Sequence, residues 1–349
     1  MSDRTLNQRV KTIPWGRIAI RIAFLVAGLV SLYVLLPPLL DVFSQTPQLE
    51  RVKWRWFFLM ALLMGGAFAA AWELTRIAVP GVSWFVAATA QLTSNAVSKV
   101  VPGGPMVGGA FYYQMLSVSG VESGVAAAAL AAVSFLSTLV LLALPGVALL
   151  LAALTAPIPD GLFPVAIAGF VLWIVMFLAA VVLVRYNRPL WILGAVVEKT
   201  VAWFAARLHR HWRVTAESFI HRRDEVVGSL GRRWVKALGM AVLNWLLDFL
   251  TLVTALVAVG AEPRPSLVLL AFAVSAVLGM IPLTPGGLGF VEAGLTGALT
   301  VAGIPANDAL LATLAYRMFQ FWLPIPAGAI AYVLFRRKYG KPSELAERT

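Results

Sequence analysis

The chain has 349 residues with a mean hydropathy of +0.85, and 60% of its residues are hydrophobic. Only 13% are charged, against about 25% in soluble domains, so the composition indicates an integral membrane protein. The absence of cysteine excludes disulfides and thiolate chemistry. The net charge of +12 is concentrated at both ends and in residues 185–236, beside apolar runs, which indicates contact with lipid headgroups rather than nucleic acid.

Several apolar runs are long enough to cross a bilayer, which takes about 20 residues. We predict full spans at 18–40, 55–79, 122–155, 162–184, 237–259 and 306–335. They divide the chain into a tail (1–17), a first transmembrane half (18–184), a basic amphipathic segment (185–236), a second half (237–335) and a tail (336–349). We expect the basic segment to lie on the cytoplasmic membrane surface, where anionic headgroups attract it.

Two further apolar segments, 82–119 and 266–302, are each interrupted by a Pro-Gly-Gly triplet, at 102–104 and 285–287. The first part of 82–119 is too polar for a helix that faces lipid. Proline ends a helix and glycine permits a sharp reversal. Such backbone is tolerated at membrane depth only where protein or a wet cavity surrounds it. Both segments are therefore predicted to be re-entrant hairpins made of two half-helices.

The two triplets lie 183 residues apart, and the same offset relates Gly120 to Gly303 and Leu116 to Leu299. Hydrophobic blocks keep this spacing, which indicates an internal repeat. Basic segments of membrane proteins stay in the cytoplasm. If each hairpin enters and leaves the membrane on the same side, all the basic segments fall in the cytoplasm, with the first hairpin starting from inside and the second from outside. The sequence thus predicts an all-α, polytopic helix bundle with two inverted span–hairpin–span repeats and cytoplasmic termini.

Ionisable residues fall near the middle of three apolar elements: Asp248, Glu292 and Arg317, with Asn244 one turn before Asp248. A charge at this depth costs about 2.5–3.5 kcal/mol and marks a functional site by default. One interpretation is that Arg317 pairs with Asp248 or Glu292 and only locks helices together. The other is that Arg317 contacts an anionic headgroup while a carboxylate balances it or carries a proton.

The Pro-Gly-Gly breaks are candidate binding elements as well. The half-helix after each break would present unpaired N–H groups, which attract anions. This predicts substrate contacts at Gly103, Gly104, Gly286 and Gly287. The alternative is that these glycines form plain tight turns. Lys99 precedes the first break and either adds a cation to the site or extends toward the interface.

The motifs of common catalytic and cofactor sites are missing from the sequence. It contains no GxxxxGK[ST], HExxH or GxSxG pattern, and its three histidines, at 209, 211 and 221, fall in one polar stretch. We therefore expect no metal, no cofactor and no enzymatic reaction in this chain.

The string PGGLGFVE at 285–292, the earlier PGG at 102–104 and the pair Tyr316-Arg317 resemble the lysylphosphatidylglycerol synthase transmembrane region, also called the flippase-like or UPF0104 family. The resemblance covers roughly residues 18–338. In the aminoacyl-phosphatidylglycerol synthases such a region is fused to an aminoacyl transferase and is held to flip the lipid product; other members are linked to polyprenyl-phosphate sugars or hopanoids. No transferase domain is present here, so the resemblance implies the translocating part alone, with functional roles for Glu292 and Arg317.

Together these features favour a multi-pass transporter of the cell (inner or plasma) membrane. It would move an anionic phospholipid or polyprenyl-phosphate-linked lipid between leaflets through a midplane cavity. One alternative is an integral-membrane lipid-modifying enzyme with Glu292 or Asp248 as base. The other is a non-transporting anchor that binds a separate lipid synthase through residues 185–236. In each case the expected partners are lipid and bilayer, not nucleic acid.

Overall fold

The computed structural model describes residues 55–101, 104–155, 231–280 and 284–340, together with scattered positions between 164 and 195 and residue 224. All regular secondary structure among these residues is helical. Four helices, Arg55–Ala78, Ser123–Ala152, Trp234–Ala258 and Ala306–Tyr339, are long and apolar enough to cross a membrane. The predicted span 18–40, the tail 1–17, most of 162–184 and most of the basic segment 185–236 lie outside the described residues. Of the predicted tail 336–349, residues 336–340 are described, and the last helix continues into it as far as Tyr339.

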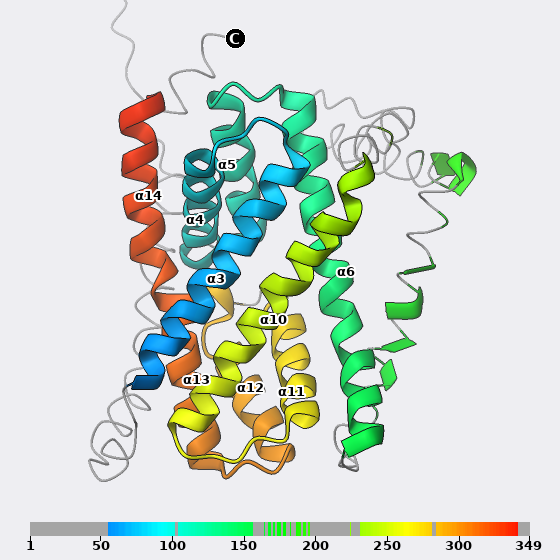
Figure 1. Ribbon diagram of the computed structural model, residues 1–349, viewed down its shortest axis with the longest axis vertical. Helices are drawn as coiled ribbons and strands as arrows, with labels where there is room; N and C mark the ends of the chain where they lie inside the picture. Colours follow the sequence, from blue (N-terminus) through cyan, green and yellow to red (C-terminus); the bar gives the residue numbers. More distant parts are fainter. Residues whose placement is uncertain are drawn as a thin grey trace, which may run out of the picture.

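Helices α3 (Arg55–Ala78) and α10 (Trp234–Ala258) lie side by side at the centre of the molecule and run in opposite directions (Figure 1). Gly66 leaves room for the partner helix, because a Cβ at this position would lie only 3.1 Å from Cδ1 of Leu247. The Asn244 side chain on α10 also donates to the Ala67 carbonyl of α3 at 2.9 Å. Residues of both helices line a cavity described below.

The first predicted hairpin, 82–119, consists of helices α4 (Trp84–Val100) and α5 (Gly104–Val118). They pack closely because α5 presents glycine to α4: a Cβ on Gly104 or Gly108 would overlap Ser98. The Ser83 side chain caps α4 by accepting from the Val86 amide. α6 (Ser123–Thr155) follows and contains Pro145 within its length.

The second predicted hairpin, 266–302, consists of helices α11 (Pro265–Leu278) and α12 (Phe290–Val301), with the short helix η2 (Pro285–Gly287) between them. α12 begins at residue 290 rather than at the expected 286. The cause lies in Gly286, Gly287 and Gly289, whose φ angles of 60°, 72° and 79° are left-handed and interrupt a right-handed helix.

The last predicted span is helical throughout but contains a π-helical turn. α13 (Ala306–Arg317) leads into η3 (Met318–Trp322) and then α14 (Pro324–Tyr339). In η3 the Leu323 amide donates to the Met318 carbonyl, five residues back. Pro324 follows directly and has no N–H, so the Gln320 carbonyl cannot accept the usual bond from four residues later.

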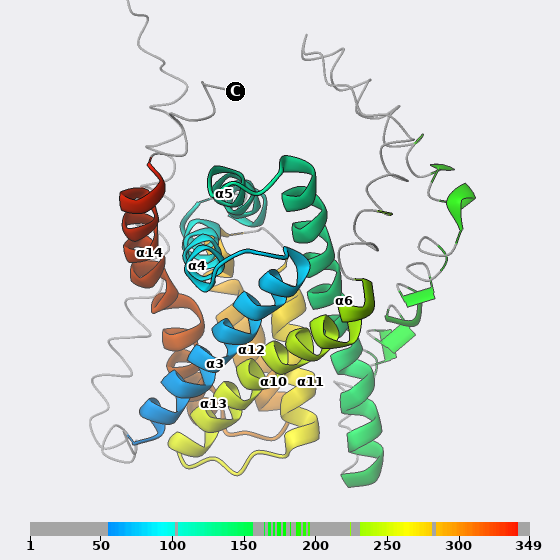
Figure 2. The same cartoon turned by 45° about the horizontal axis from the view of Figure 1, so that its top comes forward.

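The local structure repeats at the 183-residue offset found in the sequence. α6 begins at Ser123 and α13 at Ala306. The turns before them contain Gly120 and Gly303, with φ angles of 97° and 94°, and their backbone hydrogen bonds follow the same pattern. In Figures 1 and 2, α4 and α5 lie toward one end of the molecule, and α11 and α12 toward the other.

Candidate functional site

The two interrupted segments meet inside the molecule. The end of α4 contacts η2 so closely that a Cβ on Gly286 would lie 2.9 Å from the Lys99 carbonyl oxygen. It would also lie 2.3 Å from the ring of Phe321. Glycine is therefore required at residue 286 both by its backbone angle and by the space available. This contact brings the ends of both predicted hairpins to one place.

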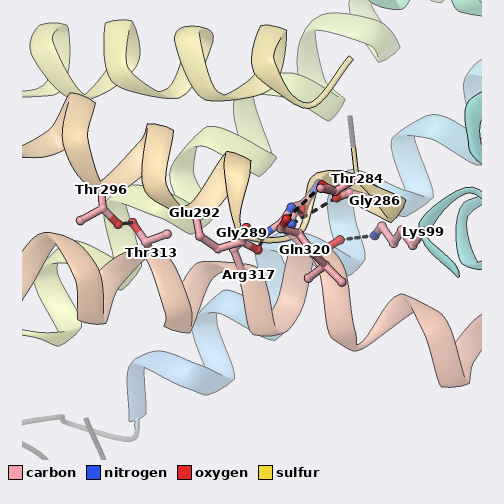
Figure 3. A network of polar contacts seen from close by, with 10 residues as sticks. Lys99, Thr284, Gly286, Gly289, Glu292, Thr296, Thr313, Arg317 and Gln320 are labelled. Atoms are coloured by element: carbon pink, nitrogen blue, oxygen red, sulfur yellow. Dashed lines mark hydrogen bonds and ion pairs between the residues drawn. The ribbon is translucent and has the colours of Figure 1, made fainter. Parts of the chain in front are cut away.

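A buried ion pair lies beside this contact (Figure 3). Nε of Arg317 donates to Oε1 of Glu292 at 2.6 Å, and the two side chains are only 5% and 8% exposed. The other carboxylate oxygen of Glu292 accepts from the Gly289 amide at 2.7 Å, at the start of α12. Glu292 thus caps its own helix while it fixes the guanidinium.

The remaining contacts of Arg317 connect three elements. Nη1 donates to Oε1 of Gln320 at 3.0 Å, and Nη2 donates to the Gly286 carbonyl at 3.3 Å. The guanidinium also lies over the ring of Phe321, 4.5 Å from its centroid. Arg317 therefore holds α12, η2 and the π turn together, and its carboxylate partner is Glu292.

Lys99 points toward the interior of the protein (Figure 3). Its ammonium donates to the Gln320 carbonyl, the group that Pro324 leaves without a helical partner. It also lies 5.6 Å from the centroid of Phe321. Lys99 therefore does not extend toward the interface, which was one of its two predicted roles.

Asp248 lies apart from the ion pair and accepts from the Tyr316 hydroxyl at 2.8 Å. Asn244 was predicted to share a cavity with Asp248, and both residues line one cavity. The Asn244 amide itself donates to the Ala67 carbonyl. The hydroxyl partner was not predicted, since only the fold brings α13 beside α10.

Two cavities adjoin at this level, and we name each after a helix that lines it. The α11 chamber, about 240 Å³, is lined by α11, α12 and α13 and includes Arg317 and Tyr316. The α4 chamber, about 220 Å³, is lined by α3, α4 and α5 and includes Lys99 and Asn244. Both chambers share Ser137, Asp248 and Gln320 in their walls. Asp248 therefore faces both cavities.

The predicted glycine contacts have different outcomes. Gly286 belongs to the Arg317 network through its carbonyl. Gly287 is buried, and a Cβ there would lie 2.5 Å from Val291. Gly104 is packed against Ser98 and lines neither chamber. Gly103 lies outside the described residues.

Comparison with known proteins places this architecture in a family. Residues 18–328 match the family described as the lysylphosphatidylglycerol synthase TM region. The chain belongs to this family. The family is named after the membrane region of lysylphosphatidylglycerol synthase, so the match relates this chain to membrane proteins of lipid metabolism.

Relatives in the same family include three proteins of Methanothermobacter thermautotrophicus, each named UPF0104 membrane protein. One is 32% identical over 91 residues, covering 26% of this chain and 27% of the relative. Another is 26% identical over 157 residues (41% and 43%), and the third 25% identical over 148 residues (42% and 42%). The chain thus aligns with less than half the length of these relatives.

Several polar residues of the site were not predicted. Gln320 contacts both Arg317 and Lys99, and Gln91 and Asn95 line the α4 chamber. The signal for the last two was present, because the sequence of α4 is too polar for a helix that faces lipid. Among the described residues, no group of three or more acidic or histidine side chains is arranged to hold a metal.

Proposed function

We propose that this protein is a transporter that moves an anionic phospholipid or polyprenyl-phosphate-linked lipid between the leaflets of the cell membrane. The observation that supports this most is the pair of adjoining chambers, with charged and amide side chains in their walls, near the place where the two interrupted segments meet. Buried polar cavities at a break in membrane helices are typical of transporter substrate sites.

The charges of the chambers suit an anionic headgroup. Arg317 lines the α11 chamber and Lys99 lines the α4 chamber, so each cavity presents one cation. Glu292 fixes the guanidinium, and Asp248 stands in the shared wall. We propose that a phosphate passes from one cation to the other. Asp248 would balance the cations when the chambers are empty.

The arrangement of the helices supports alternating access through inverted repeats. α3 and α10 run in opposite directions, as do α6 and the continuous α13–α14 segment (Figure 1). The start of α10 follows the basic turn Gly231–Arg233, and α14 ends with Arg336, Arg337 and Lys338. The start of α10 and the last turn of α14 lie at the same end of the molecule, at the top of Figure 1. We propose that this end is cytoplasmic and that α4–α5 and α11–α12 are re-entrant from opposite sides.

Transport is tested in liposomes that contain the purified protein and a fluorescent phosphatidylglycerol. A membrane-impermeant reductant bleaches only the outer leaflet, so the bleached fraction reports lipid movement. We expect movement with the natural protein and none with the double variant Arg317→Gln/Glu292→Gln, which removes both charges without leaving one unpaired. Lys236→Gln, at an exposed position on α10, serves as the control. Unchanged movement in the double variant contradicts a role for the pair.

Two alternatives predict different products of the same preparations. A lipid-modifying enzyme would change the mass of the added lipid, which mass spectrometry of the extracted lipids detects. An anchor for a separate lipid synthase would move no lipid and would co-purify with that enzyme. The same assay is repeated with a fluorescent polyprenyl phosphate, and failure of the natural protein to move either of the two lipids would contradict the transporter proposal.

A further inference from the structure

One face of α4 carries a stripe of polar side chains at intervals of four residues: Gln91, Asn95 and Lys99. This spacing places them above one another on the helix, over about 12 Å. All three line the α4 chamber. We propose that this stripe binds the phosphate oxygens of the transported headgroup and guides them along the helix. The inference rests on the proposed function and assigns its anion-binding surface.

Lys99 supplies the charge of the stripe. An ammonium has three hydrogens, and the Gln320 carbonyl takes one of them. No ion pair joins Lys99 to a carboxylate within the part of the chain that the structure describes. Arg317, by contrast, is engaged by Glu292, Gln320 and Gly286. Lys99 therefore has donor capacity left for a ligand in the chamber.

The two amides extend the donor surface away from the break. Oε1 of Gln91 accepts from the Trp72 indole at 3.0 Å, which fixes this amide and leaves its NH₂ group as a donor. Oδ1 of Asn95 is buried and has no hydrogen-bond partner among the described residues. No bond holds that oxygen in place, so the Asn95 amide can turn its NH₂ group toward a phosphate.

The packing of α4 against α14 and α5 does not account for the stripe. α4 contacts α14 through Leu92 and Ala96, next to Gly328. It contacts α5 through Ser94 and Ser98, next to Gly108. The stripe residues Gln91, Asn95 and Lys99 take part in neither of these two helix contacts. At the 183-residue offset the second half carries Val274, Leu278 and Pro282, which are apolar, so the stripe is not a general requirement of the repeat.

Binding is measured in detergent with two phosphate esters, dihexanoyl phosphatidylglycerol and free glycerol 3-phosphate. The variants are Gln91→Leu, Asn95→Leu and Lys99→Gln. The matched control is Gln114→Leu on α5, which lines neither chamber. Loss of a hydrogen bond to a charged ligand is expected to weaken binding about tenfold in each stripe variant, with no change in the control.

The two ligands separate the possible sources of the phosphate. Stripe-dependent binding of the lipid alone assigns the site to a headgroup, and stripe-dependent binding of both assigns it to any phosphate ester. Unchanged affinity in all the stripe variants would overturn the inference. If Lys99→Gln fails to fold, the affinities of Gln91→Leu and Asn95→Leu decide whether the stripe binds the phosphate. Lys99→Arg then shows whether a positive charge at residue 99 is sufficient for binding.

The liposome assay distinguishes this inference from the proposed function. If the natural protein moves lipid and the stripe variants move it equally well, the inference fails and the transporter proposal stands. If the natural protein binds the lipid through the stripe but moves none, the transporter proposal fails and the binding site stands.

Discussion

Arg317 and Glu292 form an ion pair with almost no contact with solvent, so removing one partner leaves a buried charge unpaired. Such a change typically costs about 3–5 kcal/mol. We expect Glu292→Gln or Arg317→Gln to lower the melting temperature in detergent strongly. The double variant should recover part of the loss, because it buries no unpaired charge.

The chain contains its own control for that prediction. Arg76 and Glu73 also pair at 2.6 Å, but their side chains are 33% and 34% exposed. Exposed pairs contribute about 0–1 kcal/mol, so Glu73→Gln should change the melting temperature little. Equal losses in Glu73→Gln and Glu292→Gln would show that burial does not set the strength of the inner pair.

Gly286 gives a second test at the residue scale. Alanine there would adopt a left-handed backbone and overlap the Phe321 ring. These two costs should total about 2 kcal/mol or more, and the displaced ring should also disturb the Arg317 contact. Gly297→Ala is the matched control, since it lies within α12 with no atom near its Cβ position. The control should be neutral or slightly stabilising in the same melting experiment.

Sequence reasoning located the charged residues of the site but not all their partners. Asp248, Glu292 and Arg317 stand out because charges are rare at membrane depth. The choice of Glu292 over Asp248 as the partner of Arg317 depends on the turn of α12, which the Gly289 amide helps to fix. The Gln320 carbonyl is harder to predict as a partner of Lys99. It is free to accept from Lys99 because Pro324, four residues later, has no N–H to donate to it.

At the scale of elements, the π turn η3 forms part of the wall of both chambers. It contains Gln320, which lies in the wall of each cavity, and Phe321, which contacts both cations. π turns inside helices frequently occur at functional sites. The shape of this segment therefore determines where the two cations lie.

Pro324→Ala tests the π turn. Alanine supplies an N–H for the Gln320 carbonyl, so the helix can become regular and compete with Lys99 for that carbonyl. We expect a melting temperature equal to or above that of the natural protein but slower lipid movement in liposomes. Pro305→Ala, outside the chambers before α13, is the control. Unchanged transport by a well-folded Pro324→Ala protein would separate the π turn from function.

The sequence predicted the elements well where a single signal dominates. Apolar length predicted α3, α6 and α10, and the glycine breaks predicted α4–α5 and α11–α12 as separate helices. The start of α12 and the π turn were missed, since they depend on backbone angles and on a carbonyl whose partner comes from α4. Apolar periodicity carries no information about either.

At the scale of the molecule, the two halves place their short helices toward opposite ends while the interruptions meet in the middle (Figures 1 and 2). If α4–α5 and α11–α12 enter the membrane from opposite sides, as we propose, one helix pair separates the cavities from each side. Moving one pair opens the site to one side without opening it to the other. This consequence depends on the two pairs entering the membrane from opposite sides.

The absence of cysteine from the chain allows a direct test of that sidedness. Single cysteines would replace Ser83 and Glu122, in the loops at the ends of α4–α5, Glu262, before α11, and Asn307, in the first turn of α13 just after α12. All four positions are exposed. A membrane-impermeant thiol reagent is applied to intact cells and to inverted vesicles. Opposed hairpins predict that the first pair reacts only in inverted vesicles and the second only in intact cells. Reaction of all four from one side would mean that both helix pairs share that side, and alternating access through inverted halves would then be wrong.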